Sequence, residues 1–72
     1  MSRTTIYMPL LNEGTDVWRP VEAEALSAGR YRILGPVSDS EEWAFVPGSI
    51  VRGVAKVFGD GNRVIVAASL SN

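Results

Sequence analysis

Apolar and polar residues alternate on both sides of a short loop within residues 16–34. A period of two places successive side chains on opposite faces of a strand, so a β-strand is predicted on each side of this loop. The loop, Ser27-Ala28-Gly29, suits a three-residue hairpin connection with Gly29 in the left-handed conformation. Because both strands then have matching apolar faces, the register is well determined. The predicted cross-strand pairs are Ala25 with Tyr31, Ala23 with Ile33 and Glu24 with Arg32.

Three further segments have features of strands. Residues 4–11 are rich in β-formers, but Pro9 cannot donate to a ladder, so this strand is expected at an edge or with a bend. Residues 43–46 predict a short strand that ends at a type II turn centred on Pro47-Gly48. Residues 63–70 are strongly strand-like.

Residues 49–58 fit two structures. Their apolar side chains recur at helical spacing, and Ser49 could cap a helix. Four β-branched residues and Gly53 are unfavourable in a helix interior, and the Asp60-Gly61 dipeptide that follows is a typical hairpin turn. A strand is therefore favoured. A two-residue turn would place Val57 opposite Val64, Ala55 opposite Val66, Gly53 opposite Ala68 and Val51 opposite Leu70.

Short strands separated by turn signals, in a chain of 72 residues, predict an all-β fold: a small five-stranded antiparallel barrel, SH3-like, formed as a single domain by residues 1–72. Closure of the barrel hides strand edges that would otherwise be exposed. The chain has no cysteine and no histidine, so a disulfide and the usual zinc sites are excluded. A core of this size rarely supplies more than about 3–5 kcal/mol without such a staple. Burial of further apolar surface in an oligomer is therefore kept as an alternative.

The longest motif is PLLNEGTDVWRPVEAE at residues 9–24, followed by GRYRILG at residues 29–35 and by EEWAF, PGS and VR within residues 41–52. Together these motifs resemble a group of short bacterial proteins of about this length, for which no activity is established. The resemblance covers nearly the whole chain. It implies a small all-β domain in which residues 50–58 form a strand. It implies no catalytic residue, so it carries no functional role over to this chain.

The residue types used in most enzymatic catalysis are missing. Without histidine and cysteine the chain lacks the commonest general base and the strongest thiol nucleophile. Glu22 and Glu24 share a strand face, as an acid–base pair would require, but solvated outer-face residues are the simpler interpretation. The turn at residues 60–62 has too few carboxylates for a calcium loop. We therefore expect a protein that is not an enzyme and that holds neither a cofactor nor a metal.

Tryptophan and arginine predict a binding surface, because both are enriched at interaction hot spots. The predicted binding residues are Trp18, Arg19, Arg32 and Trp43. For two of them a structural role is an equal or better interpretation: Trp18 could cover an open barrel end as a secondary core, and Trp43 could pack in the core with Phe45. Arg19 falls on the inner strand face. Either its guanidinium group extends outward at the barrel rim, or Pro20 marks a bulge that shifts the register.

The formal net charge of −1 does not favour nucleic acid or an anionic membrane as a partner. No apolar run is long enough for a signal peptide or a membrane span, so a cytoplasmic location is expected. These observations favour a non-enzymatic module that binds a protein or peptide. A barrel that binds single-stranded nucleic acid is the alternative, because arginines and aromatic residues lie along the predicted strands. A structural subunit of an assembly is the third hypothesis.

Overall fold

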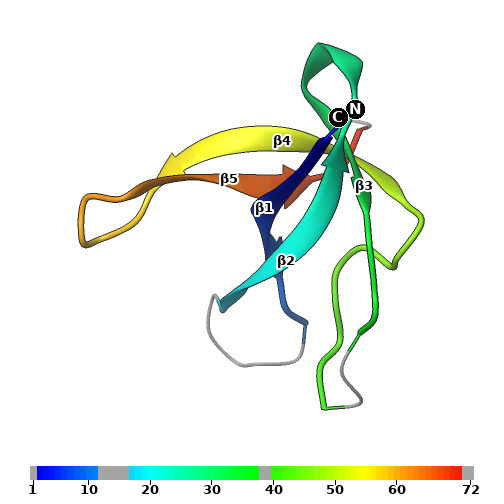
Figure 1. The fold of residues 1–72 in the computed structure, drawn as a ribbon. Helices are drawn as coiled ribbons and strands as arrows, with labels where there is room; N and C mark the ends of the chain where they lie inside the picture. Colours follow the sequence, from blue (N-terminus) through cyan, green and yellow to red (C-terminus); the bar gives the residue numbers. More distant parts are fainter. Residues whose placement is uncertain (1, 12–16, 38–39, 71–72) are drawn as a thin grey trace.

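The computed structural model describes residues 2–11, 17–37 and 40–70, and it contains five strands arranged as a closed barrel (Figure 1). The strands follow one another around the barrel in chain order. Their bounds are β1 (Ser2–Pro9), β2 (Trp18–Ala25), β3 (Arg30–Ile33), β4 (Ile50–Val57) and β5 (Arg63–Ala68). A single 3₁₀ turn, η1 (Ser27–Gly29), connects β2 to β3. The predicted small all-β barrel is confirmed, whereas the SH3-like assignment stays a prediction.

The barrel closes through a parallel strand pair, in which Tyr7 of β1 lies opposite Val66 of β5. The other neighbouring pairs are antiparallel. A parallel closure is required here, because in a chain-order ring the odd-numbered strands all run in one direction. The expectation of an entirely antiparallel barrel was therefore wrong for this pair. Beyond the closure, the β4–β5 hairpin projects from the body of the protein as an arm (Figure 1).

The β2–β3 hairpin has the predicted register, with Ala25 opposite Tyr31, Ala23 opposite Ile33 and Glu24 opposite Arg32. The start of the predicted element, Asp16, lies outside the described residues. The loop contains three residues, as expected, and the Leu26 amide donates to the Arg30 carbonyl at 2.8 Å. Gly29 is left-handed, with φ of 73°, but Ala28 is left-handed too, with φ of 63°. The loop therefore places an alanine in a conformation that disfavours a Cβ atom.

Ala28→Asn should raise the free energy of unfolding by about 0.5–1 kcal/mol, because asparagine tolerates the left-handed conformation better than alanine. Urea denaturation followed by circular dichroism measures this difference. Ser27→Asn is the matched control, since Ser27 in the same loop does not have a positive φ. Equal stabilisation by both substitutions would contradict the explanation based on Ala28.

The β4–β5 hairpin confirms the strand prediction for residues 49–58, but the predicted register is wrong by one residue. Val57 lies opposite Arg63, and Ala55 lies opposite Ile65. The cause is a three-residue loop, because the Phe58 amide donates to the Asn62 carbonyl at 2.9 Å across residues 59–61. Gly61 has the positive φ, 89°, that this loop needs. The Asp60 carboxylate accepts a hydrogen bond from the Asn62 amide at 3.0 Å and holds the turn.

The shifted register changes which β5 side chains face the barrel interior. Ala67, opposite Gly53, is buried in the core, and Ile65 packs partly buried against it. Val66, which the two-residue turn would have directed inward, is buried outside that core, next to Tyr7 at the parallel closure. A one-residue slip exchanges the two faces of a strand, as expected from a period of two.

The core is formed by inward side chains of all five strands and by one residue of the β3–β4 connection. Its buried members are Ile6, Met8, Val21, Ala23, Ile33, Trp43, Val51 and Ala67. The predicted strand at residues 43–46 is wrong, because there only Trp43 forms a single bridge, to Leu10. Two backbone hydrogen bonds flank this bridge, from the Leu11 amide to the Glu42 carbonyl at 2.8 Å and from the Ala44 amide to the Pro9 carbonyl at 3.0 Å, and the Trp43 ring is buried in the core. The predicted turn at Pro47-Gly48 is confirmed by a positive φ at Gly48 and a hydrogen bond from the Ser49 amide to the Val46 carbonyl.

Candidate binding surface

Three arginines have acidic partners, and together they neutralise three glutamates. Arg32 Nη1 lies 2.7 Å from Glu24 Oε1, as predicted from the hairpin register. Arg19 Nε lies 3.1 Å from Glu41 Oε1, and Arg3 Nη1 lies 3.8 Å from Glu22 Oε2. Exposed ion pairs of this kind contribute about 0–1 kcal/mol to stability. Their main effect is on the charge pattern, because they place a cation beside each of Glu22, Glu24 and Glu41.

Four cationic side chains have no ion-pair partner among the described residues: Arg30, Arg52, Lys56 and Arg63. Arg30 on β3 lies directly opposite Arg52 on β4. Like charges at directly opposite positions are unfavourable for a strand pair, so this arrangement does not serve stability. An anion between the two guanidinium groups would relieve the repulsion.

The outer face of β4 alternates exposed aliphatic and cationic residues. With a period of two, Arg52 and Lys56 share this face with Ile50 and Val54, which are 40% and 37% exposed. We call this surface the β4 surface; it consists of Arg30, Ile50, Arg52, Val54 and Lys56.

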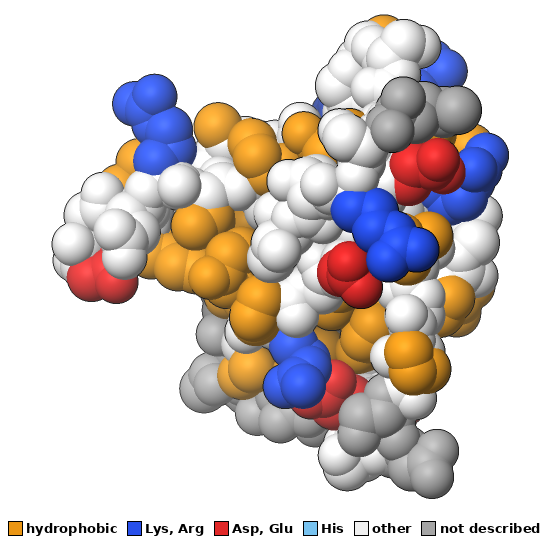
Figure 2. Space-filling model, viewed as in Figure 1, with side chains coloured by type: hydrophobic (Ala, Val, Ile, Leu, Met, Phe, Trp, Pro, Cys, Tyr) orange, Lys and Arg blue, Asp and Glu red, His pale blue; other side chains and the backbone are white. Residues whose placement is uncertain are grey.

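An aromatic cluster lies where the arm meets the outer wall of the barrel. The rings of Tyr7 and Phe58 meet edge to face with centroids 5.2 Å apart, and Trp18 packs against Phe58 with centroids 6.4 Å apart. Lys56 Nζ lies 5.6 Å from the centroid of the Trp18 ring, within range of a cation–π contact. The cluster therefore attaches the arm to β1 and β2 and positions one cation of the β4 surface. Figure 2 shows hydrophobic side chains in this angle between the arm and the body.

Arg19 occupies the barrel rim. The β1–β2 ladder runs without interruption from Ser2 opposite Ala25 to Pro9 opposite Trp18, so Pro20 does not mark a bulge. Arg19 lies on the side of buried Met8, and its head reaches out to Glu41. Of the two alternatives for Arg19, the structure therefore agrees with a guanidinium group that extends outward at the rim, and not with a bulge at Pro20.

The predicted binding residues do not form one surface. Trp18 is half-buried in the aromatic cluster, which resembles the secondary core considered above but lies on the outer wall rather than over a barrel end. Trp43 is a core residue, 8% exposed, and its Nε1 donates to Glu41 Oε1 at 3.1 Å. Arg32 is paired with Glu24 and borders the β4 surface opposite Ile50.

Arg30, Arg52 and Lys56 were not among the predicted binding residues, and the sequence connected them only with the nucleic-acid alternative, as cations along the predicted strands. The signal that would have identified them is the pairing of Arg30 with Arg52. That pairing depends on the register between β3 and β4, which are separated by residues 34–49 rather than joined by one short hairpin loop, so no local pattern reports it.

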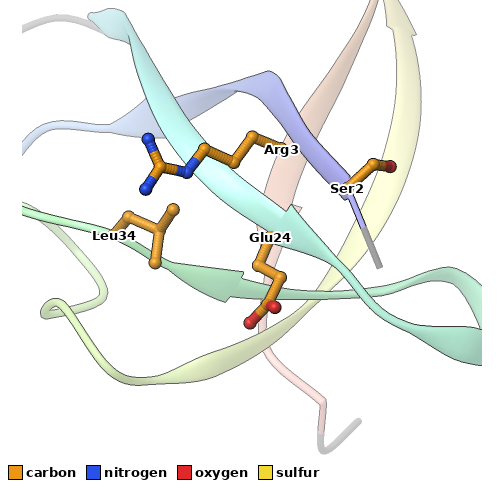
Figure 3. A pocket seen from close by; sticks show the side chains of 4 residues that line it. All are labelled: Ser2, Arg3, Glu24 and Leu34. Carbon is orange, nitrogen blue, oxygen red and sulfur yellow. The ribbon is translucent and has the colours of Figure 1, made fainter.

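Two hollows add little to the chemistry of the site. The first hollow has a volume of about 250 Å³ and is lined by Ser2, Arg3, Glu24 and Leu34. Figure 3 shows the Arg3 and Glu24 side chains extending in different directions, so their polar groups do not converge on one point. A second hollow, of about 480 Å³, lies between β1 and the start of β5. It is lined by Thr5, Tyr7, Arg63, Val64 and Ile65.

Within the described residues, no group of three or more His, Cys, Asp or Glu side chains is placed to hold a metal ion. The described part of the chain also contains no helix with the length and apolar character needed to cross a membrane. Comparison with known proteins gave no match to a family model, to a curated protein or to a solved structure. The geometry of the β4 surface therefore carries the functional argument.

Proposed function

We propose that this protein is a non-enzymatic interaction module that binds an acidic segment of a partner protein on the β4 surface. The observation that carries the proposal is the Arg30–Arg52 juxtaposition, in which neither arginine has an ion-pair partner among the described residues, with Lys56 further along the same face. Like charges held together are stabilised by an anionic partner, and such complementarity gives specificity and a fast association rate. Ile50 and Val54 are exposed beside these cations on the same face of β4.

A partner protein fits this surface better than single-stranded nucleic acid, the second candidate. Non-specific binding of single strands relies on accessible aromatic faces on which bases stack. Here the rings of Tyr7, Trp18 and Phe58 pack against one another. The side chains that alternate with the cations on β4 are aliphatic, so they offer no ring on which a base could stack. In this proposal Trp18 positions Lys56, and Arg32 borders the surface.

The test uses a fluorescently labelled peptide in which glutamate and valine alternate, Ac-(Glu-Val)₄-NH₂, with binding followed by anisotropy. Binding should weaken as salt is added, because exposed charges are screened over about 8–10 Å. Arg52→Glu should weaken it by about fivefold to tenfold, since an attraction becomes a repulsion of similar size. Arg3→Glu makes the same change in net charge on β1, and it should leave the affinity within about twofold.

The proposal fails if the peptide does not bind at about 50 mM salt, where screening is weak. It also fails if Arg52→Glu and Arg3→Glu weaken binding equally, because the effect would then reflect net charge alone. A labelled single-stranded oligonucleotide is titrated in parallel. Salt-sensitive binding of the oligonucleotide without binding of the peptide would favour the nucleic-acid alternative.

A further inference from the structure

β4 is paired on both sides only over its first residues. On one side it pairs with β3 through Ile50, Val51 and Arg52, and β3 begins at Arg30. On its other side the pairing with β5 continues to Val57. Residues 54–57 therefore have one edge that no described strand covers, and they lie in the arm that Figure 1 shows projecting from the body.

The direction of the backbone groups on this edge follows from two hydrogen bonds. The Phe58 amide donates to the Asn62 carbonyl, so residues of even number in β4 have their backbone groups directed toward β5. The Ile33 amide donates to the Ser49 carbonyl, so residues of odd number have theirs directed toward β3. The N–H and C=O groups of Ala55 and Val57 consequently point out of the sheet, past the beginning of β3.

The side chains along this edge differ between the two faces. Lys56 lies on the outer face together with Arg52 and Val54. The opposite face carries Ala55 and Val57, and Val57 is 59% exposed. A strand added at this edge would meet cations on one face and small or aliphatic side chains on the other. An extended segment in which acidic and apolar residues alternate matches both faces.

We infer that the acidic partner segment binds as an additional β-strand at residues 54–57 of β4, hydrogen-bonded to the outward backbone groups of Ala55 and Val57, with its carboxylates on the side of Arg52 and Lys56. This inference rests on the proposed function and adds the mode of binding. The main chain provides the hydrogen bonds, and the alternating side chains provide the selectivity.

A second copy of this chain is a less suitable occupant of the same edge. Antiparallel self-pairing centred on Ala55 would join two β4 surfaces, so the unpaired arginines and lysines of both copies would lie in one continuous sheet. Like charges brought together in this way oppose association. An acidic segment instead cancels the charge that the edge already carries.

Amide hydrogen exchange, measured by NMR on the wild-type protein, tests the inference directly. In the free protein the Ala55 and Val57 amides should exchange quickly, whereas those of Val54 and Lys56 are protected by β5. Saturating Ac-(Glu-Val)₄-NH₂ should slow exchange of the Ala55 and Val57 amides by about tenfold or more, with little change at Val54 and Lys56. Unchanged exchange at Ala55 and Val57 while the peptide is bound would overturn the inference.

A variant and a pair of modified peptides provide independent tests. Ala55→Pro removes one outward N–H but no hydrogen bond to β5, so the fold should persist while binding weakens by about tenfold. If Ala55→Pro does not fold, the wild-type protein is tested instead with two N-methylated versions of the peptide. One is methylated at every valine and the other at every glutamate. Strand addition predicts that only one of the two still binds, because alternate N–H groups face β4.

The outcomes separate the two proposals. Peptide binding that depends on Arg52 but is insensitive to N-methylation and to Ala55→Pro would overturn strand addition and leave the interaction module standing. Absence of peptide binding removes both. A concentration-dependent dimer that protects the Ala55 and Val57 amides without peptide would show that the edge is occupied by a second copy, and this too would overturn the inference.

Discussion

Trp43→Ala should leave most of the protein unfolded at 25 °C. Removing a buried tryptophan side chain costs about 3–5 kcal/mol, which equals the whole stability expected of a single core in a chain of this size. The Trp43 ring is 8% exposed and belongs to the core. Its loss would also leave Glu41 without the hydrogen bond from Nε1. Loss of the near-ultraviolet circular dichroism signal and of a cooperative urea transition would demonstrate this result.

Trp18→Ala is the matched control for this experiment. It deletes the same side chain from the half-buried aromatic cluster outside the barrel, where the contacts are with Phe58 and Lys56. A smaller loss is expected, of about 1–2 kcal/mol, because less apolar area leaves the protein interior. If both variants lost equal stability, the claim that the buried Trp43 ring stabilises the fold more than the half-buried Trp18 ring would be wrong.

Gly53→Ala should lower the free energy of unfolding by about 1–3 kcal/mol, the usual cost of overpacking a filled site. A Cβ atom at this position would lie against Cε1 of the Tyr31 ring and 2.8 Å from Cγ2 of Ile65. Neither neighbour can move without loss of contact, because Tyr31 and Ile65 both pack against the core. Thermal and urea denaturation followed by circular dichroism measure the change.

Gly59→Ala is the corresponding control, because a Cβ atom there meets nothing within 4 Å. This substitution should change the stability by less than about 0.5 kcal/mol. A double-mutant cycle with Tyr31→Ala tests the mechanism, since Gly53→Ala should cost much less once the ring is absent. An undiminished cost in the Tyr31→Ala background would show that contact with the ring is not the cause.

The candidate site was less predictable than the fold. Trp18 and Arg32 border the β4 surface, but the prediction grouped them with Arg19 and Trp43, which meet instead at Glu41 at the barrel rim. Tryptophan and arginine were selected by residue type, and residue type does not distinguish a buried ring or a neutralised arginine from an exposed one. The juxtaposition of Arg30 and Arg52 depends on contacts between strands that are distant in the sequence.

Local sequence by itself determined the β2–β3 hairpin and indicated the positions of β1 and β5, because alternation of period two and a loop containing glycine act over only a few residues. It also predicted a strand at residues 43–46 that does not form. It also identified β4 as a strand and Pro47-Gly48 as a turn. The tertiary structure alone decided the register of β5, the burial of Trp43, the parallel closure at Tyr7 and Val66, and the free edge of β4. Each of these depends on the partner that a residue finds across the barrel, and a one-residue difference in a turn is enough to exchange the buried face for the exposed one.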